Sequence, residues 1–223
     1  MSIWIFLCTI FLIILILVIV LPIQLKNLGI AKVYYVNLDS RPDRRQQIEK
    51  ELDGMGIRYE RFPAIHDENG AIGCCKSHLA IIKLAKKNKY KNVLVFEDDF
   101  QFLVDKKEFY KNMRALKKIP FDGCLLAYNT VNLMDSPFSK LHKIVDAQTT
   151  SGYMINSHYY EPLINCWETA LDMFQKTGDW NYTCDQSWKE LQRKDNWYCF
   201  KTRIGKQRHS YSNIEKHDVQ PFA

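Results

Sequence analysis

The segment NVLVFEDDFQF, residues 92–102, places an apolar run directly against three carboxylates. Its β-branched and aromatic side chains are typical of a strand that is buried on both faces. Glu97, Asp98 and Asp99 then follow, and the apolar pattern resumes at Phe100. Like charges at this spacing repel one another, and each loses solvation wherever the strand end is covered. We therefore expect a positively charged partner at this point of the structure.

The elements before this strand predict an α/β fold. KVYYVNL (residues 32–38) and IRYERF (57–62) have the composition of strands, and the segment between them has the apolar spacing of a helix that begins at an N-cap, Ser40. A second helix, about residues 73–89, precedes the acidic strand. The three acids therefore follow the carboxyl end of a strand, where open α/β sheets bind ligands.

The second half of the domain alternates less regularly. Its expected elements are helices near residues 106–117 and 158–176, a shorter helix after Asp185, and strands near 122–129, 143–148, 151–156 and 197–204. This order predicts an antiparallel or mixed insertion in the α/β sheet.

The N-terminal segment, residues 3–23, is apolar and carries no charge. At ~1.5 Å per residue it is about long enough to cross ~30 Å of hydrocarbon, and no signal-peptidase site follows it. We expect a single-pass membrane protein with a transmembrane anchor (1–25), a connector (26–31) and one domain (32–223). Basic residues after the span favour a cytoplasmic domain, whereas the sequon at Asn181 favours a luminal one, so the orientation stays open.

The formal charge of +6 does not indicate a nucleic-acid partner. The lysines of residues 83–92 cluster at a helix end, where cations interact favourably with the helix dipole, and no nucleic-acid-binding motif accompanies them. The seven cysteines include no C-x-x-C pair, which argues against a zinc ribbon or a thioredoxin-like motif. Their spacing leaves the choice between thiols and disulfides open.

The acidic run has two interpretations. Clustered carboxylates bind a hard divalent cation through oxygen, and such a cation can hold a diphosphate. Acidic residues are also common in solvated turns after strands. The residues alone do not decide between a metal site and a turn.

A second polar group follows the first strand and comprises Asn37, Asp39, Arg41 and Arg44. Arginine binds phosphate oxygens in a bidentate manner, and Asn and Asp side chains bind ribose or base groups. An ordinary helix entry with solvated charges is the competing interpretation.

Six motifs in order resemble family 25 glycosyltransferases, the group that includes lipooligosaccharide-biosynthesis galactosyltransferases and collagen galactosyltransferases. They are YVNLDSRPDRR (35–45), ERFPAI (60–65), IGCCKSHLAII (72–82), VLVFEDDF (93–100), SGYMI (151–155) and QRHSYSNIE (207–215). Together these motifs span nearly all of the expected domain.

The resemblance implies a GT-A type, Rossmann-like fold that binds a UDP-sugar donor. The EDD triplet then corresponds to the family's metal-binding motif. Asp99 is the first candidate ligand for Mn²⁺ or Mg²⁺ and Glu97 the second, while Asp98 lies closer to the ribose or assists the ion. The cation would neutralise the departing diphosphate.

The resemblance also implies donor contacts from two further motifs. Ser77 and His78 correspond to the family's Ser-His pair near the donor, although a helical histidine is more often a structural hydrogen-bonding group. Ser151, Gly152 and Tyr153 are candidate contacts to the donor or acceptor, with a core position as the alternative for Tyr153.

Inverting transfer needs a base for the acceptor hydroxyl. We expect Asp185 in this role, with Asp179 as second choice, although an acid in a first helical turn also stabilises the helix dipole.

Cys74 is interpreted as a packing residue. His209 is a candidate late metal ligand, and Asn213 departs from the family's usual Asp.

The predicted function is metal-dependent, inverting transfer of a hexose, galactose or glucose, from a UDP-sugar to a hydroxyl of a glycan or hydroxylated protein. Two rivals remain: a non-catalytic, membrane-tethered carbohydrate-binding protein and a metal-dependent phosphohydrolase. A metal-dependent phosphohydrolase normally has several His and Asp ligands in motif spacing. The six histidines of this sequence form no such set.

Overall fold

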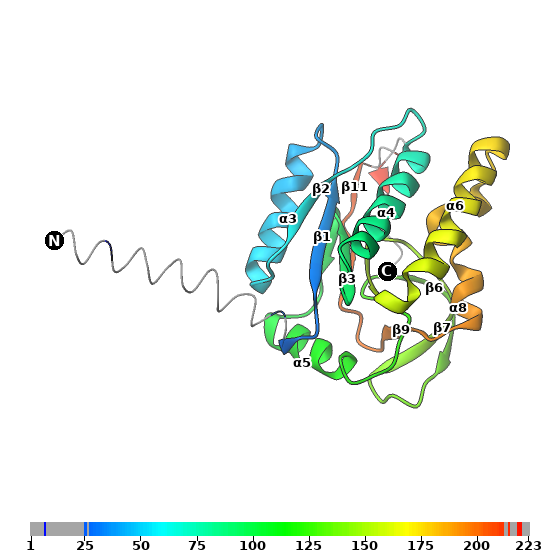
Figure 1. Ribbon diagram of the computed structural model, residues 1–223. Helices are drawn as coiled ribbons and strands as arrows, with labels where there is room; N and C mark the ends of the chain where they lie inside the picture. The colour runs from blue at the N-terminus through cyan, green and yellow to red at the C-terminus, as the bar shows by residue number, and fades with distance from the viewer. Residues whose placement is uncertain (1–6, 8–24, 26, 212–213, 215–217, 220–223) are drawn as a thin grey trace.

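The structure, a computed structural model, describes residues 7, 25, 27–211, 214 and 218–219. Within these residues, the largest feature is a mixed sheet of eight strands (Figure 1). In spatial order the strands are β2 (Glu60–Pro63), β1 (Lys32–Asn37), β3 (Asn92–Glu97), β8 (Gly152–Asn156), β5 (Gly123–Leu125), β9 (Trp197–Phe200), β7 (Leu141–Gln148) and β6 (Asn129–Asp135). The predicted α/β class is confirmed at this level.

The strand directions explain why strands and helices alternate less regularly in the second half of the sequence. β1 pairs in parallel with β2 and β3, as expected of the opening strand–helix–strand units. β8 then inserts antiparallel between β3 and β5, and β7 and β6 add further antiparallel pairs. The start of β8 therefore lies beside the acidic end of β3. Phe96 pairs with Gly152, and the amide of Glu97 donates to the carbonyl of Ser151 at 2.9 Å.

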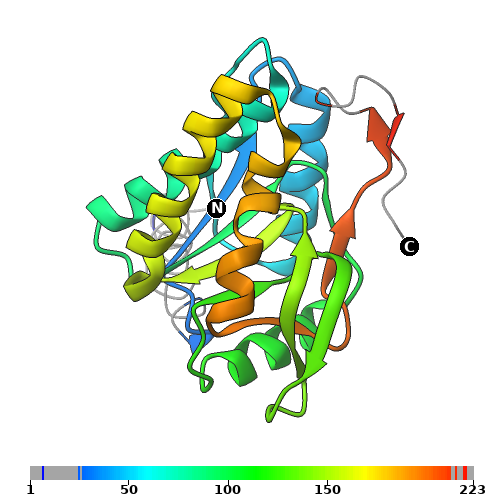
Figure 2. The ribbon, with the colours of Figure 1, turned by 90° about the vertical axis from the view of Figure 1, so that its right-hand side faces the viewer.

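Helices cover both faces of this sheet (Figure 2). They are α3 (Pro42–Met55), α4 (Gly70–Lys87), α5 (Lys106–Leu116), α6 (Tyr160–Thr177), α7 (Cys184–Ser187) and α8 (Lys189–Lys194), with short 3₁₀ turns η2 (Ser157–Tyr159) and η3 (Trp180–Tyr182). Helices α3 and α5 pack on one face, and α4 and α6 on the other. Successive residues of β3 alternate between these two cores: Val93 and Val95 join one, and Leu94 and Phe96 the other. This alternation confirms a strand buried on both faces.

Several element boundaries differ from the sequence prediction, and the starts of α3 and β2 are two of them. Helix α3 begins at Pro42 after an N-cap at Arg41 that makes no side-chain capping bond, so Ser40 is not the cap. Proline suits the first helical position because its missing N–H has no intrahelical partner there. The helix ends before Gly56, which adopts the left-handed conformation with φ 64°. β2 begins at Glu60, three residues later than expected.

The expectation of a single-pass membrane protein with an N-terminal transmembrane helix is corrected. Across the part of the chain that the structure describes, no helix is both long and apolar enough to cross a membrane. The predicted span, residues 3–23, lies outside the described residues apart from Leu7. The domain boundaries stay a prediction, but Leu28 and Ile30, within the predicted connector, are buried in the core beside α5.

Two small ribbons complete the fold. β4 (Phe100–Phe102) pairs with β10 (Gly205–Gln207), and β11 (Ser210–Tyr211) pairs with β12 (Asp218–Val219). The ring of Phe100 follows the acids directly and is fully buried against two glycines. A Cβ at Gly152 would lie 2.5 Å from this ring, and a Cβ at Gly205 would also clash with it. Gly152 therefore allows the chain to return to the core immediately after the acids.

Replacing Gly152 with alanine should overpack the core and lower the free energy of unfolding by about 1–3 kcal/mol. The matched control is Gly54→Ala in α3, where a Cβ meets nothing within 4 Å. That change should be neutral or stabilising by up to about 1 kcal/mol. Urea denaturation of both variants measures the difference. Equal stability of the two variants would contradict the packing role of Gly152.

Candidate functional site

A cleft of about 300 Å³ opens at the carboxyl ends of β1 and β3, and we call it the edge cleft. Its walls come from the start of α3, the loop at residues 64–68, the start of α4 and the three acids. Six predicted site residues besides Glu97 and Asp99 line it: Asn37, Arg41, Arg44, Ser77, His78 and Asp98. The sheet edge where ligands were expected is therefore hollow and carries charged side chains.

Glu97 is held by neutral and basic donors from two elements. Its Oε1 lies 3.1 Å from Nε2 of His78 on α4 and accepts a hydrogen bond from the hydroxyl of Thr150, just before β8. Burial acts to raise the pKa of Glu97, but His78 and Thr150 outweigh it, so the pKa lies below its usual value. Glu97 is thus stabilised as a carboxylate.

Asp98 has the most complete set of partners. Its two oxygens accept hydrogen bonds from Nδ2 of Asn37 at 2.8 Å and from the guanidinium of Arg44 at 2.9 Å. Burial nevertheless raises the pKa of Asp98, against the opposing effect of Arg44 and Asn37. Arg44 is therefore the positively charged partner of Asp98 that we expected from the sequence.

Asp99 is the least satisfied of the three acids. Its Oδ1 accepts a long hydrogen bond, 3.3 Å, from Ser151, and Oδ2 lies 3.5 Å from the Arg44 guanidinium. Burial, followed by the negative charge of Glu97, raises the pKa of Asp99 to about 8. Asp99 therefore favours its protonated form at neutral pH. A bound cation would balance the negative charge of its carboxylate in the same way as the proton does.

Asn37 at the end of β1 organises this edge. Besides Asp98, its Nδ2 donates to the carbonyl of Arg41 at 3.0 Å, and its Oδ1 accepts from Nε of Arg61 at 3.1 Å. Arg61 also binds the carboxylate of Asp39, which is exposed and does not line the edge cleft. Arg61 was not predicted, because its partners lie 22 and 24 residues away in sequence.

The two arginines of the predicted phosphate group have different surroundings. Arg44 lies between Asp98 and Asp99 and is largely buried. Arg41 lines the edge cleft and makes a bidentate pair with Asp43 at 3.0 and 2.9 Å. Of the two, Arg41 has its charge engaged outside the acidic group.

Ser77 is a structural residue of the cleft wall. It is fully buried, donates to the carbonyl of Gly73 at 2.7 Å, and accepts from the amide of Ile65 at 2.8 Å. The close approach needs a glycine, since a Cβ at Gly73 would lie 2.7 Å from the Ile65 carbonyl oxygen. Ser77 thereby fixes the loop that forms one side of the edge cleft.

Ser151, just before β8, and Gly152 and Tyr153 at its start do not line the edge cleft. Ser151 bonds to Asp99, and Gly152 makes room for the ring of Phe100. Tyr153 is fully buried, with its hydroxyl 2.9 Å from Nδ1 of His78. Ser151 and Tyr153 thus contact Asp99 and His78, two side chains that do line the cleft.

Asp185 lies at the start of α7 and outside the lining of the edge cleft. Its oxygens accept from the Thr183 hydroxyl at 3.0 Å and the Thr149 amide at 3.2 Å. Burial raises the pKa of Asp185, and the nearby charge of Glu97 adds to the effect.

The two alternative candidates lie away from the cleft. Asp179 is exposed and caps η3 by accepting from the Asn181 amide at 2.9 Å. His209 is also exposed and does not line the edge cleft. Asn213 lies outside the described residues.

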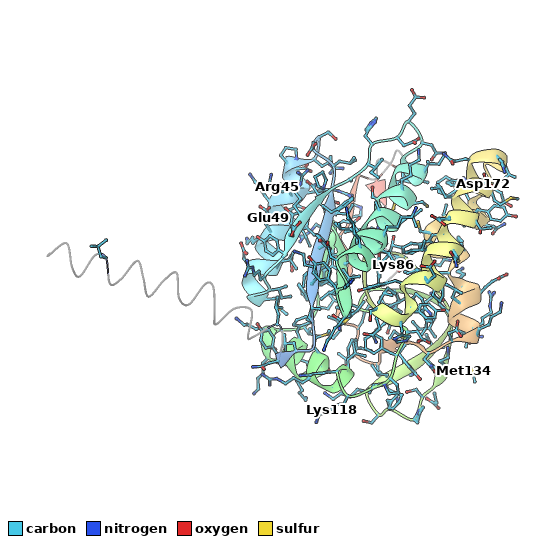
Figure 3. All side chains as sticks on the ribbon, viewed as in Figure 1. Arg45, Glu49, Lys86, Lys118, Met134 and Asp172 are labelled. Carbon is cyan, nitrogen blue, oxygen red and sulfur yellow. The ribbon has the colours of Figure 1, made fainter. Side chains whose placement is uncertain are left out.

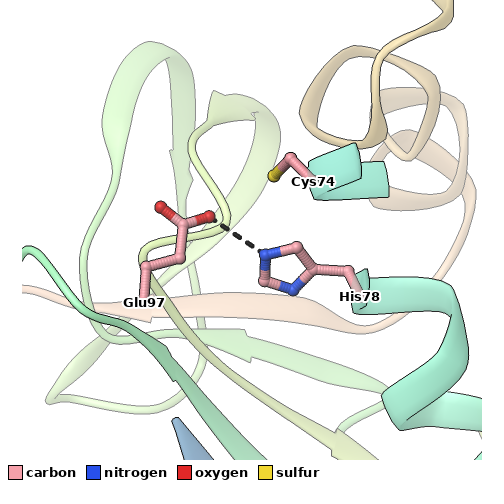
Figure 4. A group of neighbouring side chains, drawn as sticks. All are labelled: Cys74, His78 and Glu97. Carbon is pink, nitrogen blue, oxygen red and sulfur yellow. Dashed lines mark hydrogen bonds and ion pairs between the residues drawn. The ribbon is translucent and has the colours of Figure 1, made fainter. Parts of the chain in front are cut away.

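Among the described residues, two sets of side chains have the chemistry to hold a metal. At the acidic edge, Asp99 and Glu97 offer carboxylate oxygens of the kind that hard cations prefer, and Asp99 has too few donors of its own. Cys74, His78 and Glu97 form a second set, with one ligand atom each within 4.8 Å of the others (Figure 4). The described cysteines are all free thiols.

Comparison with known proteins confirms the resemblance found in the motifs. No family model matches the sequence. Curated proteins named "Glycosyltransferase 25 family member" from Drosophila melanogaster and Aedes aegypti are 28% and 27% identical to this chain, and each match covers 34% of it. The chain spans 17% of the length of either relative.

The fold is similar to that of a glycosyltransferase involved in the glycosylation of the major capsid of PBCV-1. The TM-score is 0.50 with 8% sequence identity, and the match covers 83% of this chain and 95% of the other. At this identity the similarity concerns the fold alone. It agrees with the mixed α/β architecture and its large central sheet.

Removing the guanidinium of Arg44 should leave Asp98 buried without a charged partner. We expect Arg44→Ala to lower the free energy of unfolding by about 2–4 kcal/mol, and Asp98→Asn in the same background to recover part of the loss. Arg45→Ala is the control, because Arg45 pairs with Glu49 on the outer surface of α3 (Figure 3) and should matter little. Chemical denaturation that ranks the two arginines equally would refute the assigned pairing.

The raised pKa of Asp99 predicts a pH-dependent stability in chelator-treated protein. Folded protein holds this proton up to about pH 8, whereas the unfolded chain loses it near pH 4, so stability falls as pH rises between these values. Asp99→Asn removes the charge, and its advantage over the parent should grow from pH 5 to pH 9, reaching roughly 3–6 °C in Tm. Thermal melts across this range measure it. A constant difference between the two proteins would show that Asp99 is not the titrating group.

Proposed function

We propose that this protein is a metal-dependent, inverting glycosyltransferase with a GT-A type fold. It transfers a hexose, galactose or glucose, from a UDP-sugar to a hydroxyl of a glycan or hydroxylated protein. The observation that carries the proposal is the acidic edge: three carboxylates at the end of β3 in a polar cleft, one of them without adequate donors. The names of the sequence relatives support the same class of activity.

The donor is proposed to bind in the edge cleft with its diphosphate toward Asp99. A cation held by Asp99 and Glu97 supplies Lewis-acid stabilisation of the charge on the leaving diphosphate. Arg44 holds the carboxylates of Asp98 and Asp99 in place, and Asn37 orients Asp98 from the other side. Arg41 provides a further positive charge on the cleft wall for a phosphate group.

Asp98 is proposed to contact the ribose. Each of its oxygens accepts one hydrogen bond from the protein and retains capacity for a second. A ribose hydroxyl fits this remaining capacity better than a metal ion does, because Arg44 already balances the charge of this carboxylate. In this proposal Asp98, whose charge Arg44 balances, binds the ribose, and Asp99, whose charge is not balanced, binds the cation.

Asp185 is proposed to be the base that accepts the proton of the acceptor hydroxyl. Burial raises its pKa, and a raised pKa strengthens a carboxylate as a base at neutral pH. Its hydrogen bonds from Thr183 and Thr149 fix the carboxylate at the start of α7. The acceptor would then approach from the α7 side, and the donor would occupy the edge cleft.

Turnover of UDP-galactose and UDP-glucose, followed as UDP release with and without sugar and hydroxylated-peptide acceptors, tests this function. We expect release that requires Mn²⁺ or Mg²⁺ and increases with an acceptor. Asp99→Asn and Asp185→Asn should each lower it about 100-fold or more. Asp172→Asn, which alters an exposed carboxylate paired with Lys176 on α6 and away from the cleft, should stay within twofold of the parent.

The same experiment separates the rivals. Acceptor-independent UDP-sugar cleavage would indicate a hydrolase. Sugar-nucleotide or glycan binding without turnover would indicate a non-catalytic carbohydrate-binding protein. Either outcome contradicts the proposed transfer reaction.

A further inference from the structure

We propose that Cys74, His78 and Glu97 form a binding site for Zn²⁺ in the wall of the edge cleft. The site differs from the one proposed for Mn²⁺ or Mg²⁺ because its metal, Zn²⁺, is softer and one of its ligands is a sulfur atom. It rests on the geometry of these three side chains and holds whether or not the protein transfers sugars.

The backbone brings the three ligands together from two elements. Cys74 and His78 are four residues apart on α4 and so lie on one face of that helix. Glu97 reaches them from the end of β3, and its Oε1 is 3.1 Å from Nε2 of His78. In Figure 4 the sulfur, the imidazole and the carboxylate point toward a common space. One ligand atom from each lies within 4.8 Å of the other two.

His78 is oriented for this role by the residue behind it. Its Nδ1 is 2.9 Å from the hydroxyl of Tyr153, a fully buried side chain packed edge-on against Trp167 and Trp188. Without metal, Nε2 of His78 donates to Glu97. When the ion binds, the proton moves from Nε2 through exchange with solvent to Nδ1, which donates to Tyr153, and the freed lone pair of Nε2 faces the ion between Glu97 and Cys74. A hydrogen bond from the second ring nitrogen is the usual support of a zinc-bound histidine.

The ligand types select the metal. A thiolate and an imidazole suit Zn²⁺, whereas Mg²⁺ prefers six oxygen ligands in octahedral geometry. On binding, the Cys74 thiol forms a sulfur–metal bond and its proton leaves to solvent, so one proton is released for each ion bound at this ligand.

The site also has an open position and an access route. All three residues line the edge cleft, so an ion can enter from solvent. Three protein ligands leave one tetrahedral position for water or another ligand on the cleft side.

Titration of the chelator-treated 223-residue chain with Co²⁺, followed by displacement with Zn²⁺, tests the site. Co²⁺ is the probe because a bound thiolate gives an absorption band in the near ultraviolet that carboxylate and imidazole ligands alone do not. We expect one such equivalent per chain, loss of the band when Zn²⁺ displaces Co²⁺, and no displacement by Mg²⁺ in excess.

Variants assign the band to individual side chains. Cys74→Ser should abolish it, and Cys166→Ser, the control at a half-buried thiol on α6, should leave it unchanged. Tyr153→Phe should retain the band but weaken Zn²⁺ binding about 10-fold or more, as expected of a positioning residue. A band that persists in Cys74→Ser, or the absence of any thiolate band in the parent, overturns the proposal.

A measurement on the unaltered chain guards against a misfolded Cys74 variant. Zn²⁺ should protect Cys74, but not Cys166, from alkylation by iodoacetamide, as read by peptide mass spectrometry. Equal labelling of Cys74 with and without Zn²⁺ contradicts the site. The outcome is independent of UDP-sugar turnover, so failure of the zinc site and failure of the proposed function are distinguishable.

Discussion

The structure depends on how three adjacent carboxylates are tolerated at the end of a strand that is buried on both faces. The register of β3 between two cores prevents the strand from sliding to move the acids into solvent. Each acid therefore needs its own compensation. Glu97 receives it from His78 and Thr150, and Asp98 from Arg44 and Asn37. Asp99 receives too little, which leaves the uncompensated negative charge concentrated at one side chain.

The compensating groups come from four separate elements, and the strand order is what assembles them. β1 positions Asn37 on one side of β3, and the segment that leads into the antiparallel β8 positions Thr150 and Ser151 on the other. Helices α3 and α4 contribute Arg44 and His78 from opposite faces of the sheet. A single parallel sheet would place the end of the next strand here, whereas the inserted β8 brings its beginning. The mixed topology is thus part of the site.

Much of the first half of the fold follows from local sequence. The apolar run of β3 and the helix before it are each encoded within a few residues. They occur close to where expected, although α4 begins at Gly70 rather than near residue 73. Local signals also misled: Ser40 has the chemistry of an N-cap, but Pro42 sets the start of the helix one residue after Arg41.

The partners of the acids were beyond local sequence. Arg44 reaches Asp98 across 54 residues and Asn37 reaches it across 61, so only the sheet order reveals the pairing. The same holds for Gly152, which resembled a donor contact and is required by the ring of Phe100. Candidate site residues were therefore predicted by type and approximate location. Only the tertiary structure shows which of them line the cleft and which contact it through another side chain.

The central claim is that the acidic edge binds a nucleotide diphosphate through a divalent cation. Isothermal titration of UDP into the chain, with Mn²⁺ present or removed by chelator, tests it most directly. The account predicts at least ~10-fold tighter UDP binding with Mn²⁺, a difference of about 1.4 kcal/mol. UDP affinity that is unchanged by both Mn²⁺ and Mg²⁺ would contradict it.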